Sequence, residues 1–315
     1  MIKRVALIDF DTPVYSSACI IQVSPILVTH KINKKRKKEF KNITEWRTFL
    51  KLNPGYSEDD FDLASEPRLK QGEEISHALH IIKNKIEGFR KLEWVSDVQL
   101  FVGGTGNYRK EHYPEYKGTR PPKPLFFQQC YEYVLNNYKD IVTVCDGEEA
   151  EDQVSIRSHA SYLRARALKS QDAMDSVVCG IDKDLNQCEG WRFNYDKPEL
   201  GVWWVDDRTA WKALCLQCFK GDNTDDIPGI VSLTPEVKEQ YGIKTKGVGD
   251  KTAELLMEGT TTVKEMTQRV VDVYRASWPD CWETKLNTNA ILLRLRKYDG
   301  ELFNFVDHAK NMGVV

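Results

Sequence analysis

Val5-Ala6-Leu7-Ile8-Asp9-Phe10-Asp11 is a short apolar run that ends in two carboxylates. A near-continuous apolar strand with an acidic end is typical of a parallel sheet that helices cover on both faces. Four further apolar runs predict more strands of the same sheet, at residues 98–102, 141–144, 177–181 and 202–205. We therefore take residues 5–8 as the first strand of an α/β fold, which ends at Asp9 and Asp11.

Helical patterns lie between the predicted strands. Apolar side chains recur with a helical period at residues 75–89, and residues 125–138 and 150–168 are two further candidate helices. Such alternation predicts βαβ units. In open sheets of this kind the functional site lies beyond the carboxyl ends of the strands. Three of the five predicted strands end at an acidic residue there, namely Asp9, Asp146 and Asp182.

The character of the chain changes after about residue 205, where it becomes mostly helical. We predict an α/β core at residues 1–204, with a basic segment at about residues 105–124, and a helical subdomain with C-terminal helices at residues 205–315. Residues 30–70 interrupt the strand and helix pattern, and we interpret them as an insertion or a mobile arm.

The composition is that of a soluble globular protein. The 315 residues include 41% hydrophobic and 29% charged side chains, with a formal net charge of −2. No stretch of about 18 apolar residues predicts a membrane-spanning helix, and the first apolar run is too short for a signal peptide. The eight cysteines show no disulfide framework, and the Cys215/Cys218 pair has no second pair to complete a zinc site. We therefore expect reduced cysteines and a cytoplasmic location.

Opposite charges gather in two short runs. Seven basic side chains lie between Lys31 and Lys41, and five acidic ones lie between Asp146 and Asp152. A protein that binds both phosphates and divalent cations carries such patches. For either run alone a solvated face is the favoured interpretation. The basic run is equally consistent with nonspecific affinity for nucleic acid and with a disordered arm.

Acidic residues also end or open several of the predicted elements. The set comprises Asp9, Asp11, Glu149, Glu151, Asp152, Asp182, Asp184, Asp222, Asp225 and Asp226. Carboxylates that converge on one sheet edge repel each other unless cations compensate them, and Mg²⁺ and Mn²⁺ prefer such oxygen ligands. Each group alone is also explained as a turn former, a helix cap or a partner of a helix dipole. Their joint appearance in this order favours metal binding.

Motifs along the chain occur in the order of a known family. They are VALID at residues 5–9, NYRK at 107–110 with YKGTR at 116–120, EAED at 149–152 with DKDLNQ at 182–187, and GDNTDDIPG at 221–229 with GVGDKTA at 247–253. Over residues 5 to about 257 the sequence resembles the flap endonuclease/5′-3′ exonuclease family, of the type found in phage enzymes and in the nuclease domains of bacterial DNA polymerases. DKDLNQ together with the two Gly-rich motifs is the most specific part of this resemblance.

The resemblance implies a PIN-like, parallel twisted sheet flanked by helices, with a helical arch and a helical C-terminal helix-three-turn-helix subdomain. It also implies a nuclease that hydrolyses DNA phosphodiesters with two Mg²⁺ or Mn²⁺ ions. By position, one ion would be held by Asp9, Glu149, Glu151 and Asp152, and the other by Asp182, Asp184, Asp222 and Asp225. A K⁺ ion is a further expectation at the helix-three-turn-helix.

The sequence departs from the family pattern at four places. Asp226 stands where the family usually has Asn and is left out of the ligand set, and Glu151 stands where Asp is usual. The second predicted strand ends in Gly103-Gly104 without a nearby carboxylate, so that this side of the site is one ligand short or is completed by water. Residues 230–246 separate the two Gly-rich motifs, and we interpret them as a loop insertion.

Basic and aromatic side chains alternate in the segment that resembles the family's arch, a pattern that suits a single DNA strand. Lys117 and Arg120 match catalytic residues at the scissile phosphate, where they would stabilise developing negative charge. The residues expected to contact DNA are Tyr15, Arg109, Tyr116, Lys117, Arg120, Gly247, Gly249, Lys251 and Thr252. The last four open a helix whose backbone N–H groups would bind phosphate; an ordinary capping turn is the alternative there, as a solvated basic loop is for Lys110 and Lys123.

These observations predict a Mg²⁺-dependent 5′-3′ exonuclease or flap endonuclease that leaves 5′-phosphorylated products, with a role in phage DNA replication or primer removal. The expected substrate is DNA with 5′ ends, flaps or nicks, and an RNA–DNA hybrid is an open alternative. We expect a monomer that acts in the cytoplasm, which is the host's cytoplasm if the chain is phage-encoded. Replication proteins are expected partners, and no membrane association is expected. The competing hypothesis is a catalytically weakened, structure-specific DNA-binding protein of the same fold, because no carboxylate accompanies Gly104.

Overall fold

The computed structural model describes residues 2–315, which divide into two compact units. The first unit contains the residues up to Asp11, Phe89–Pro121 and Asp140–Val315, and the second contains Thr12–Gly88 and Pro122–Lys139. The expected boundary at residues 204/205 lies inside the first unit, because the sheet and the C-terminal helices belong to one compact body. None of the helices formed by residues 2–315 is long and apolar enough to cross a membrane.

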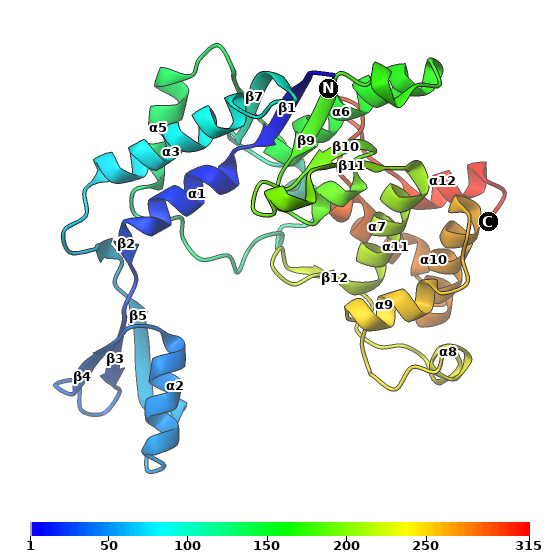
Figure 1. Cartoon of the computed structure of the whole chain (residues 1–315). Coiled ribbons are helices and arrows are strands. Elements are labelled where there is room, and N and C mark those ends of the chain that lie inside the picture. The colour runs from blue at the N-terminus through cyan, green and yellow to red at the C-terminus, as the bar shows by residue number, and fades with distance from the viewer. Residues whose placement is uncertain (1) are drawn as a thin grey trace. The chain divides into compact units, whose positions relative to one another are not determined.

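A six-stranded sheet forms the centre of the first unit (Figure 1). Its strands, in spatial order, are β11 (Val202–Val205), β10 (Gly190–Phe193), β9 (Ser176–Cys179), β1 (Arg4–Asp9), β7 (Val95–Gly103) and β8 (Val142–Cys145). Neighbouring strands are parallel except β10 and β11, which are antiparallel. The expectation of a mainly parallel sheet flanked by helices is confirmed, and all five predicted strands are present.

The apolar pattern did not predict β10, because its short sequence Gly190-Trp191-Arg192-Phe193 places a charged residue inside the strand. Arg192 is nevertheless only 2% exposed, and its guanidinium donates to the backbone oxygen of Leu185. A buried arginine that donates to one backbone oxygen therefore stands where an apolar residue was expected, while its Nε has no hydrogen-bond partner among the described residues.

Helix α6 (Ala150–Ala167) packs against β1, β7 and β9. Leu7 from the sheet, Val154 from the helix and Leu295 from the C-terminal region meet in one buried cluster. Glu149 is the N-cap residue of α6, and Glu151 lies in its first turn. This packing therefore holds the acidic start of the helix at the edge of the sheet where β1 and β9 end.

The remainder of the first unit is mostly helical. Its helices are α7 (Asp207–Lys220), α8 (Pro235–Tyr241), α9 (Asp250–Met257), α10 (Val263–Ser277), α11 (Trp282–Leu293) and α12 (Phe305–Asn311), and a hairpin of β12 (Gly221–Asp222) and β13 (Ile227–Pro228) follows α7. Short 3-10 helices are η2 (Gln171–Ala173), η3 (Asp184–Gln187) and η4 (Pro198–Leu200). Phe219, Leu256, Val270 and Leu286 belong to the large hydrophobic core that these helices share.

Residues 230–246, expected as a loop insertion, contain helix α8. Val237 in this helix and Ile243 after it are 5% and 6% exposed and belong to the same hydrophobic core. The backbone N–H of Leu233 also donates to the oxygen of Lys246 at 3.0 Å. The insertion is therefore a closed, packed element.

Residues 105–124, which we call the arch segment, contain little helix. The expectation of a helical arch is wrong for this structure, because α4 covers only Tyr108–His112 and is followed by turns and irregular chain. Pro114, Pro121, Pro122 and Pro124 explain the difference, because proline lacks the N–H group that a helix interior needs.

The second unit contains most of α1 (Asp11–Ile20) and α3 (Ile75–Arg90), the helix α5 (Phe127–Asn137), and the strand pair β2 (Gln22–Val23) and β6 (Arg68–Leu69). It also contains a separate three-stranded sheet of β3 (Ile26–His30), β4 (Lys37–Phe40) and β5 (Phe61–Ser65), with α2 (Ile43–Leu52) and η1 (Glu58–Asp60) (Figure 1). The basic run lies on β4 and in the turn before it. These residues are therefore folded, and the alternative of a disordered arm is wrong.

Candidate functional site

Carboxylates gather where β1 and β9 end and α6 begins. Asp9 is the last residue of β1, Glu151 lies in the first turn of α6, and Asp182 and Asp184 follow β9. One carboxylate oxygen each of Glu151, Asp182 and Asp184 lies within 4.8 Å of the other two. Because β1 and β9 are parallel neighbours, their carboxyl ends meet at the same edge of the sheet.

These carboxylates oppose one another's ionisation. Burial raises the pKa of Asp9 to about 8, and the charges of Asp11 and Asp182 contribute in the same direction. Burial followed by Asp182 raises the pKa of Asp184 to about 7, and the same two causes raise that of Glu151 well above its usual range. A cluster with such excess negative charge and with oxygen donors fits a divalent cation of the Mg²⁺ type.

Two buried glutamines position Asp184. Gln217, on α7, donates from Nε2 to Asp184 Oδ1. Gln187 donates from Nε2 to Gln217 Oε1 at 2.5 Å and to the backbone oxygen of Leu293 at 2.8 Å. This role of Gln217 was not predictable from the sequence, because a single polar residue on an otherwise apolar helix face is ambiguous.

A second group of carboxylates lies at the β12–β13 hairpin. Asp222 in β12 accepts from Lys183 Nζ at 2.9 Å. Asp225 is paired with Arg120, and its Oδ2 lies 3.6 Å from Lys117 Nζ. Asp222 and Asp225 are 6% and 7% exposed. In contrast to the first group, each of these buried carboxylates has a cationic partner from the protein.

Lys117 connects the arch segment with the N-cap residue of α6. Its Nζ donates to Glu149 Oε1, and its backbone N–H donates to the Asp225 carbonyl at 3.0 Å. Its backbone is left-handed, with a φ of 57°. Burial opposes the ionisation of Glu149, but Lys117 and Arg109 outweigh it and lower the pKa of this carboxyl to about 2. Glu149 is therefore ionised and paired by the protein itself.

Arg109 and Asp152 lie in the interior of the first unit. The two residues form a direct ion pair, and their side chains are at most 1% exposed. Arg109 also donates to the backbone oxygens of Leu292 and Arg294, and Asp152 accepts from the backbone N–H of Arg296 at 3.0 Å. This placement differs from the expected roles, since Arg109 does not reach the surface where DNA would bind and the oxygens of Asp152 are used within the protein.

Tyr116 is also placed differently from the expectation of a DNA contact. It is 1% exposed, and its hydroxyl lies 3.2 Å from Glu149 Oε2 and 3.1 Å from Asp225 Oδ2. Burial and the charge of Glu149 raise the pKa of Tyr116 far above its usual range, so the phenol remains protonated and donates. Arg120, with 45% of its side chain exposed, is accessible from solvent.

The end of β7 has no carboxylate of its own, but two acidic neighbours approach it. Asp11 Oδ2 accepts from the backbone N–H of Gly103 at 3.0 Å, and Asp146 Oδ1 accepts from that of Thr105 at 2.8 Å. A Cβ atom on Gly104 would lie 2.3 Å from Asp146 Oδ1, so glycine is needed there. Asp11 is thus a site residue that the predicted ligand set omitted, and its signal was the Asp-x-Asp spacing after the first strand.

Asp226, which was left out of the predicted ligand set, binds the arch segment. Its two carboxylate oxygens accept from the backbone N–H and the hydroxyl of Thr119 at 2.8 and 2.6 Å. It adopts a left-handed backbone conformation with a φ of 58°. The sequence alone did not indicate this contact between the two motifs.

The expected phosphate-binding turn precedes α9. Gly249 is the N-cap residue of this helix, Gly247 lines a cavity of about 480 Å³, and Lys251 is exposed. Thr252 is 7% exposed, and its hydroxyl lies 3.1 Å from that of Thr245. The turn therefore presents backbone and a lysine to solvent, while Thr252 faces inwards.

Tyr15, the remaining residue expected to contact DNA, belongs to the second unit and is 41% exposed. Its ring centroid lies 6.5 Å from that of Phe127 in the same unit. The eight predicted metal ligands and the two predicted catalytic residues all lie in the first unit.

No family model matches the sequence. Among solved structures, the chain is similar to a bacteriophage T5 D15 protein co-crystallised with metal ions, with 18% identity, a TM-score of 0.39, and coverage of 76% of this chain and 88% of the other. It is also similar to a D15 flap endonuclease variant in a pseudo-enzyme–product complex with DNA and metal ions (16%, 0.39, 76% and 90%) and to a T5 5′-exonuclease variant (15%, 0.32, 76% and 91%). At this level of similarity, the fold assignment rests on the sheet topology of the chain itself.

Proposed function

We propose that the chain is a metal-dependent 5′-nuclease of the flap endonuclease/5′-3′ exonuclease family, with a PIN-like core, that leaves 5′-phosphorylated ends. The observation that carries this proposal is the cluster of Glu151, Asp182 and Asp184 with Asp9 beside it. Their raised pKa values reflect negative charge that the protein does not neutralise. A structural cluster without a cation would be a net cost to folding.

The cluster would hold a Mg²⁺ or Mn²⁺ ion through its carboxylate oxygens. When bound, such an ion supplies Lewis-acid stabilisation and lowers the pKa of a coordinated water. A second ion is proposed at Asp222 and Asp225, whose carboxylates are here paired with Lys183 and Arg120. A K⁺ ion is proposed at the turn before α9.

The cations of the arch segment would bind the phosphate that is cleaved. Lys117 and Arg120 contact Glu149 and Asp225 in this structure. A phosphate oxygen offers the same kind of charged acceptor as a carboxylate oxygen. We infer that the two side chains exchange carboxylate partners for phosphate oxygens when DNA binds, and then stabilise the charge that develops during hydrolysis.

Arg109 would act by support rather than by contact with DNA. Its ion pair with Asp152 fixes the first turn of α6, the same turn that carries Glu151. We infer a similar role for Tyr116, whose hydroxyl links Glu149 and Asp225. The duplex part of the substrate would meet Gly249 and Lys251 at the N-terminus of α9, where backbone N–H groups bind phosphate without reading sequence.

A cleavage assay tests the proposal. Wild type, Asp182→Ala and Asp222→Ala are incubated with a 5′-labelled flap substrate at several Mg²⁺ concentrations, with EDTA as the metal-free control. Asp280→Ala, which removes an exposed carboxylate far from the motifs in sequence, is the matched variant. We expect Asp182→Ala and Asp222→Ala to lose cleavage while they retain duplex binding, and Asp280→Ala to behave as wild type.

Wild-type turnover by both site variants would contradict the two-metal assignment. The competing function, a catalytically weakened DNA-binding protein, is favoured by the glycine at position 104. This competing function predicts that wild type binds the flap substrate but does not cleave it at any Mg²⁺ or Mn²⁺ concentration. Parallel assays on nicked and RNA-primed duplexes identify the preferred substrate, and size-exclusion chromatography tests the expected monomer.

A further inference from the structure

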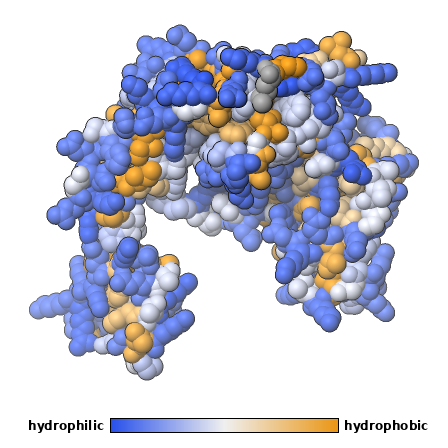
Figure 2. All heavy atoms as spheres, viewed as in Figure 1, coloured by the Kyte–Doolittle hydropathy of each residue, from blue (hydrophilic) through white to orange (hydrophobic). Residues whose placement is uncertain are grey.

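Residues 26–65 form a small folded region that the proposed nuclease reaction does not use. We call it the β3–β5 module, because its sheet has the order β4-β3-β5, with α2 against one face. Val28, Phe40 and Trp46 form its buried core, and Phe49 and Phe61 pack against them. Figure 2 shows, on the face in view, a small group of hydrophobic atoms on this module surrounded by hydrophilic ones.

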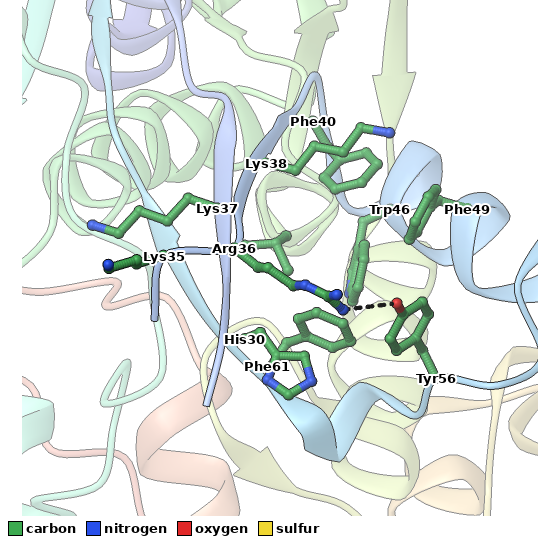
Figure 3. Close-up of a pocket in the computed structure, with 11 residues that line it drawn as sticks. His30, Lys35, Arg36, Lys37, Lys38, Phe40, Trp46, Phe49, Tyr56 and Phe61 are labelled. Atoms are coloured by element: carbon green, nitrogen blue, oxygen red, sulfur yellow. Dashed lines mark hydrogen bonds between the residues drawn. The ribbon is translucent and has the colours of Figure 1, made fainter. Parts of the chain in front are cut away.

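The core of the module contains aromatic rings and leaves a cavity of about 250 Å³ (Figure 3). The rings of Trp46 and Phe49 are stacked with centroids 5.6 Å apart, and Phe61 meets Trp46 edge-on at 4.9 Å. Tyr56 and His30 continue this aromatic wall towards solvent, and Tyr56 is 37% exposed. The wall therefore offers accessible ring surfaces rather than a filled interior.

A polar group inside this wall also lacks a partner. Trp46 is 1% exposed, and its indole Nε1 is buried without a hydrogen-bond acceptor among the described residues. Buried tryptophan N–H groups usually find an acceptor. Trp46 also lines the cavity, so this unsatisfied donor belongs to a residue of the wall that an occupant would meet.

Strand alternation divides the basic run between two faces. Arg36 and Lys38 lie on the same side of β4 and its preceding turn as Phe40 (Figure 3). Lys35 and Lys37 also line the cavity, but their side chains point away from the aromatic rings. The Lys38 ammonium lies 4.5 Å from the centroid of Phe49, and Arg36 Nη1 donates to the Tyr56 hydroxyl at 3.4 Å.

The residues that line the cavity include no aspartate or glutamate. The cavity thus combines flat aromatic surfaces, two cations directed towards them and a local excess of positive charge. These are the features by which proteins hold single-stranded nucleic acid, with bases stacked on rings and phosphates near lysine and arginine. A purely solvated basic face would not require one cation to lie over aromatic rings and a second to donate to a tyrosine hydroxyl.

We propose that the β3–β5 module is a second nucleic-acid site, which binds a single-stranded DNA segment with an unpaired base at the aromatic wall and the adjoining phosphates at Arg36 and Lys38. The ligand is single-stranded because base pairing hides the edges of a base, and base stacking in a duplex covers its faces. The proposal rests on the proposed function only in that the chain meets DNA. Binding at this module requires neither the carboxylate cluster nor a metal ion.

Binding of a fluorescently labelled oligothymidylate to the full chain, measured by anisotropy in EDTA, tests the proposal. We expect the double variant Arg36→Ala/Lys38→Ala to bind roughly tenfold more weakly than wild type. The slope of log Kd against log salt concentration should also be smaller than that of wild type by about 1.4, which is about 0.7 for each of two lost phosphate contacts. The matched double variant Lys35→Ala/Lys37→Ala removes the same charge from the other face and is expected to stay within about twofold of wild type.

Tyr56→Ala removes an exposed ring without changing charge and is expected to weaken binding by about tenfold, as for the loss of one base stack. Circular dichroism establishes that each variant is folded, and a misfolded Tyr56→Ala is replaced by Tyr56→Leu. Equal effects of the two double variants would show a nonspecific basic surface and overturn the proposal, as would wild-type binding by all variants. Full competition by thymidine monophosphate or inorganic phosphate at micromolar concentration would identify a mononucleotide or phosphate site instead.

Cleavage of the flap substrate by the same preparations separates this proposal from the nuclease proposal. If wild type does not cleave, the nuclease proposal fails while the comparison of the two double variants in EDTA still decides the binding proposal. If wild type cleaves and the two double variants bind equally, the nuclease proposal stands and the second site is rejected.

Discussion

Arg109 Nη1 and Nη2 donate to the two carboxylate oxygens of Asp152 at 2.6 and 2.9 Å, so that the side chains form a bidentate ion pair. The pair joins the arch segment to the first turn of α6. Its charges are withdrawn from water, and they are stabilised by each other and by backbone groups of residues 292–296. The Arg109–Asp152 pair therefore holds the helix turn that carries Glu151, and the pair itself is not accessible to a substrate.

Arg109→Met should destabilise the protein strongly, because it leaves Asp152 as a buried charge without its partner. We expect the free energy of unfolding in urea to fall by about 3–5 kcal/mol. Arg164→Met is the control, since Arg164 and its partner Asp175 are both more than half exposed; its loss should stay below about 1 kcal/mol. Similar losses for the two variants would contradict the supporting role of Arg109.

The metal-free protein should become less stable as the pH rises. Asp9 has a pKa of about 8 in the folded state against an ordinary 3.8, so between these values the folded protein binds a proton that the unfolded chain releases. Stability then decreases with increasing pH from about 4 to about 8. Urea unfolding in EDTA across this range measures the effect, and Asp9→Asn should reduce the slope. A slope that is unchanged in Asp9→Asn would be evidence against the burial of this charge.

Divalent cations should stabilise the protein more at pH 8 than at pH 5, because protons and metal compete for the same carboxylates. The midpoint of thermal unfolding is measured with and without Mn²⁺ at constant ionic strength, with K⁺ as the monovalent control. We expect a larger rise of Tm at pH 8, and its loss in Asp182→Asn. An equal rise in both proteins would place the ion elsewhere.

Lys117→Met should reduce cleavage without abolishing folding or duplex binding. Loss of one pre-positioned cation at a reacting phosphate costs on the order of 10²–10³ in kcat. Lys110→Met removes an exposed lysine from the same segment and should leave kcat within about twofold of wild type. Single-turnover cleavage of a flap substrate at saturating enzyme separates this effect from DNA binding, and similar rates for the two variants would refute it.

Gly229→Ala should be poorly tolerated, unlike Gly249→Ala. A Cβ atom on Gly229 would lie 2.2 Å from the backbone carbon of Lys220 and 2.4 Å from the nitrogen of Gly221, whereas one on Gly249 would meet nothing within 4 Å. We expect a loss of about 3 kcal/mol for the first substitution and a change below about 1 kcal/mol for the second. Chemical denaturation of the two variants provides the comparison.

The sequence predicted the sheet well because its predicted strands read as apolar runs, and the two central strands β1 and β9 are buried along almost their whole length. The apolar pattern did not predict β10, because it does not reveal that Arg192 is buried and donates to a backbone oxygen. The arch segment was expected to be helical by resemblance, but its prolines remove the backbone donors of a helix interior.

Most of the predicted site residues lie in the first unit, but their partners were not predictable. Lys117 and Arg109 are both basic residues next to tyrosines, yet the first pairs with Glu149 near the cluster and the second is buried with Asp152. The packing of α4 against α11 distinguishes them, because it encloses the Arg109 guanidinium and leaves the Lys117 side chain at the site. The roles of Asp11 and Gln217 were not predicted for the same reason, since their contacts come from distant segments.

The anchoring of the Arg109–Asp152 pair by residues 292–296 also concerns synthesis. Asp152 and the backbone N–H of Arg296 are separated by 144 positions in the chain. At about 5–20 residues per second, a ribosome takes on the order of 10–30 s to make the intervening segment. During that interval the ion pair lacks the backbone groups that later enclose it, and β9, β10 and β11 are themselves synthesised. The support of the first turn of α6 is thus completed by a segment that is translated long after Asp152 itself.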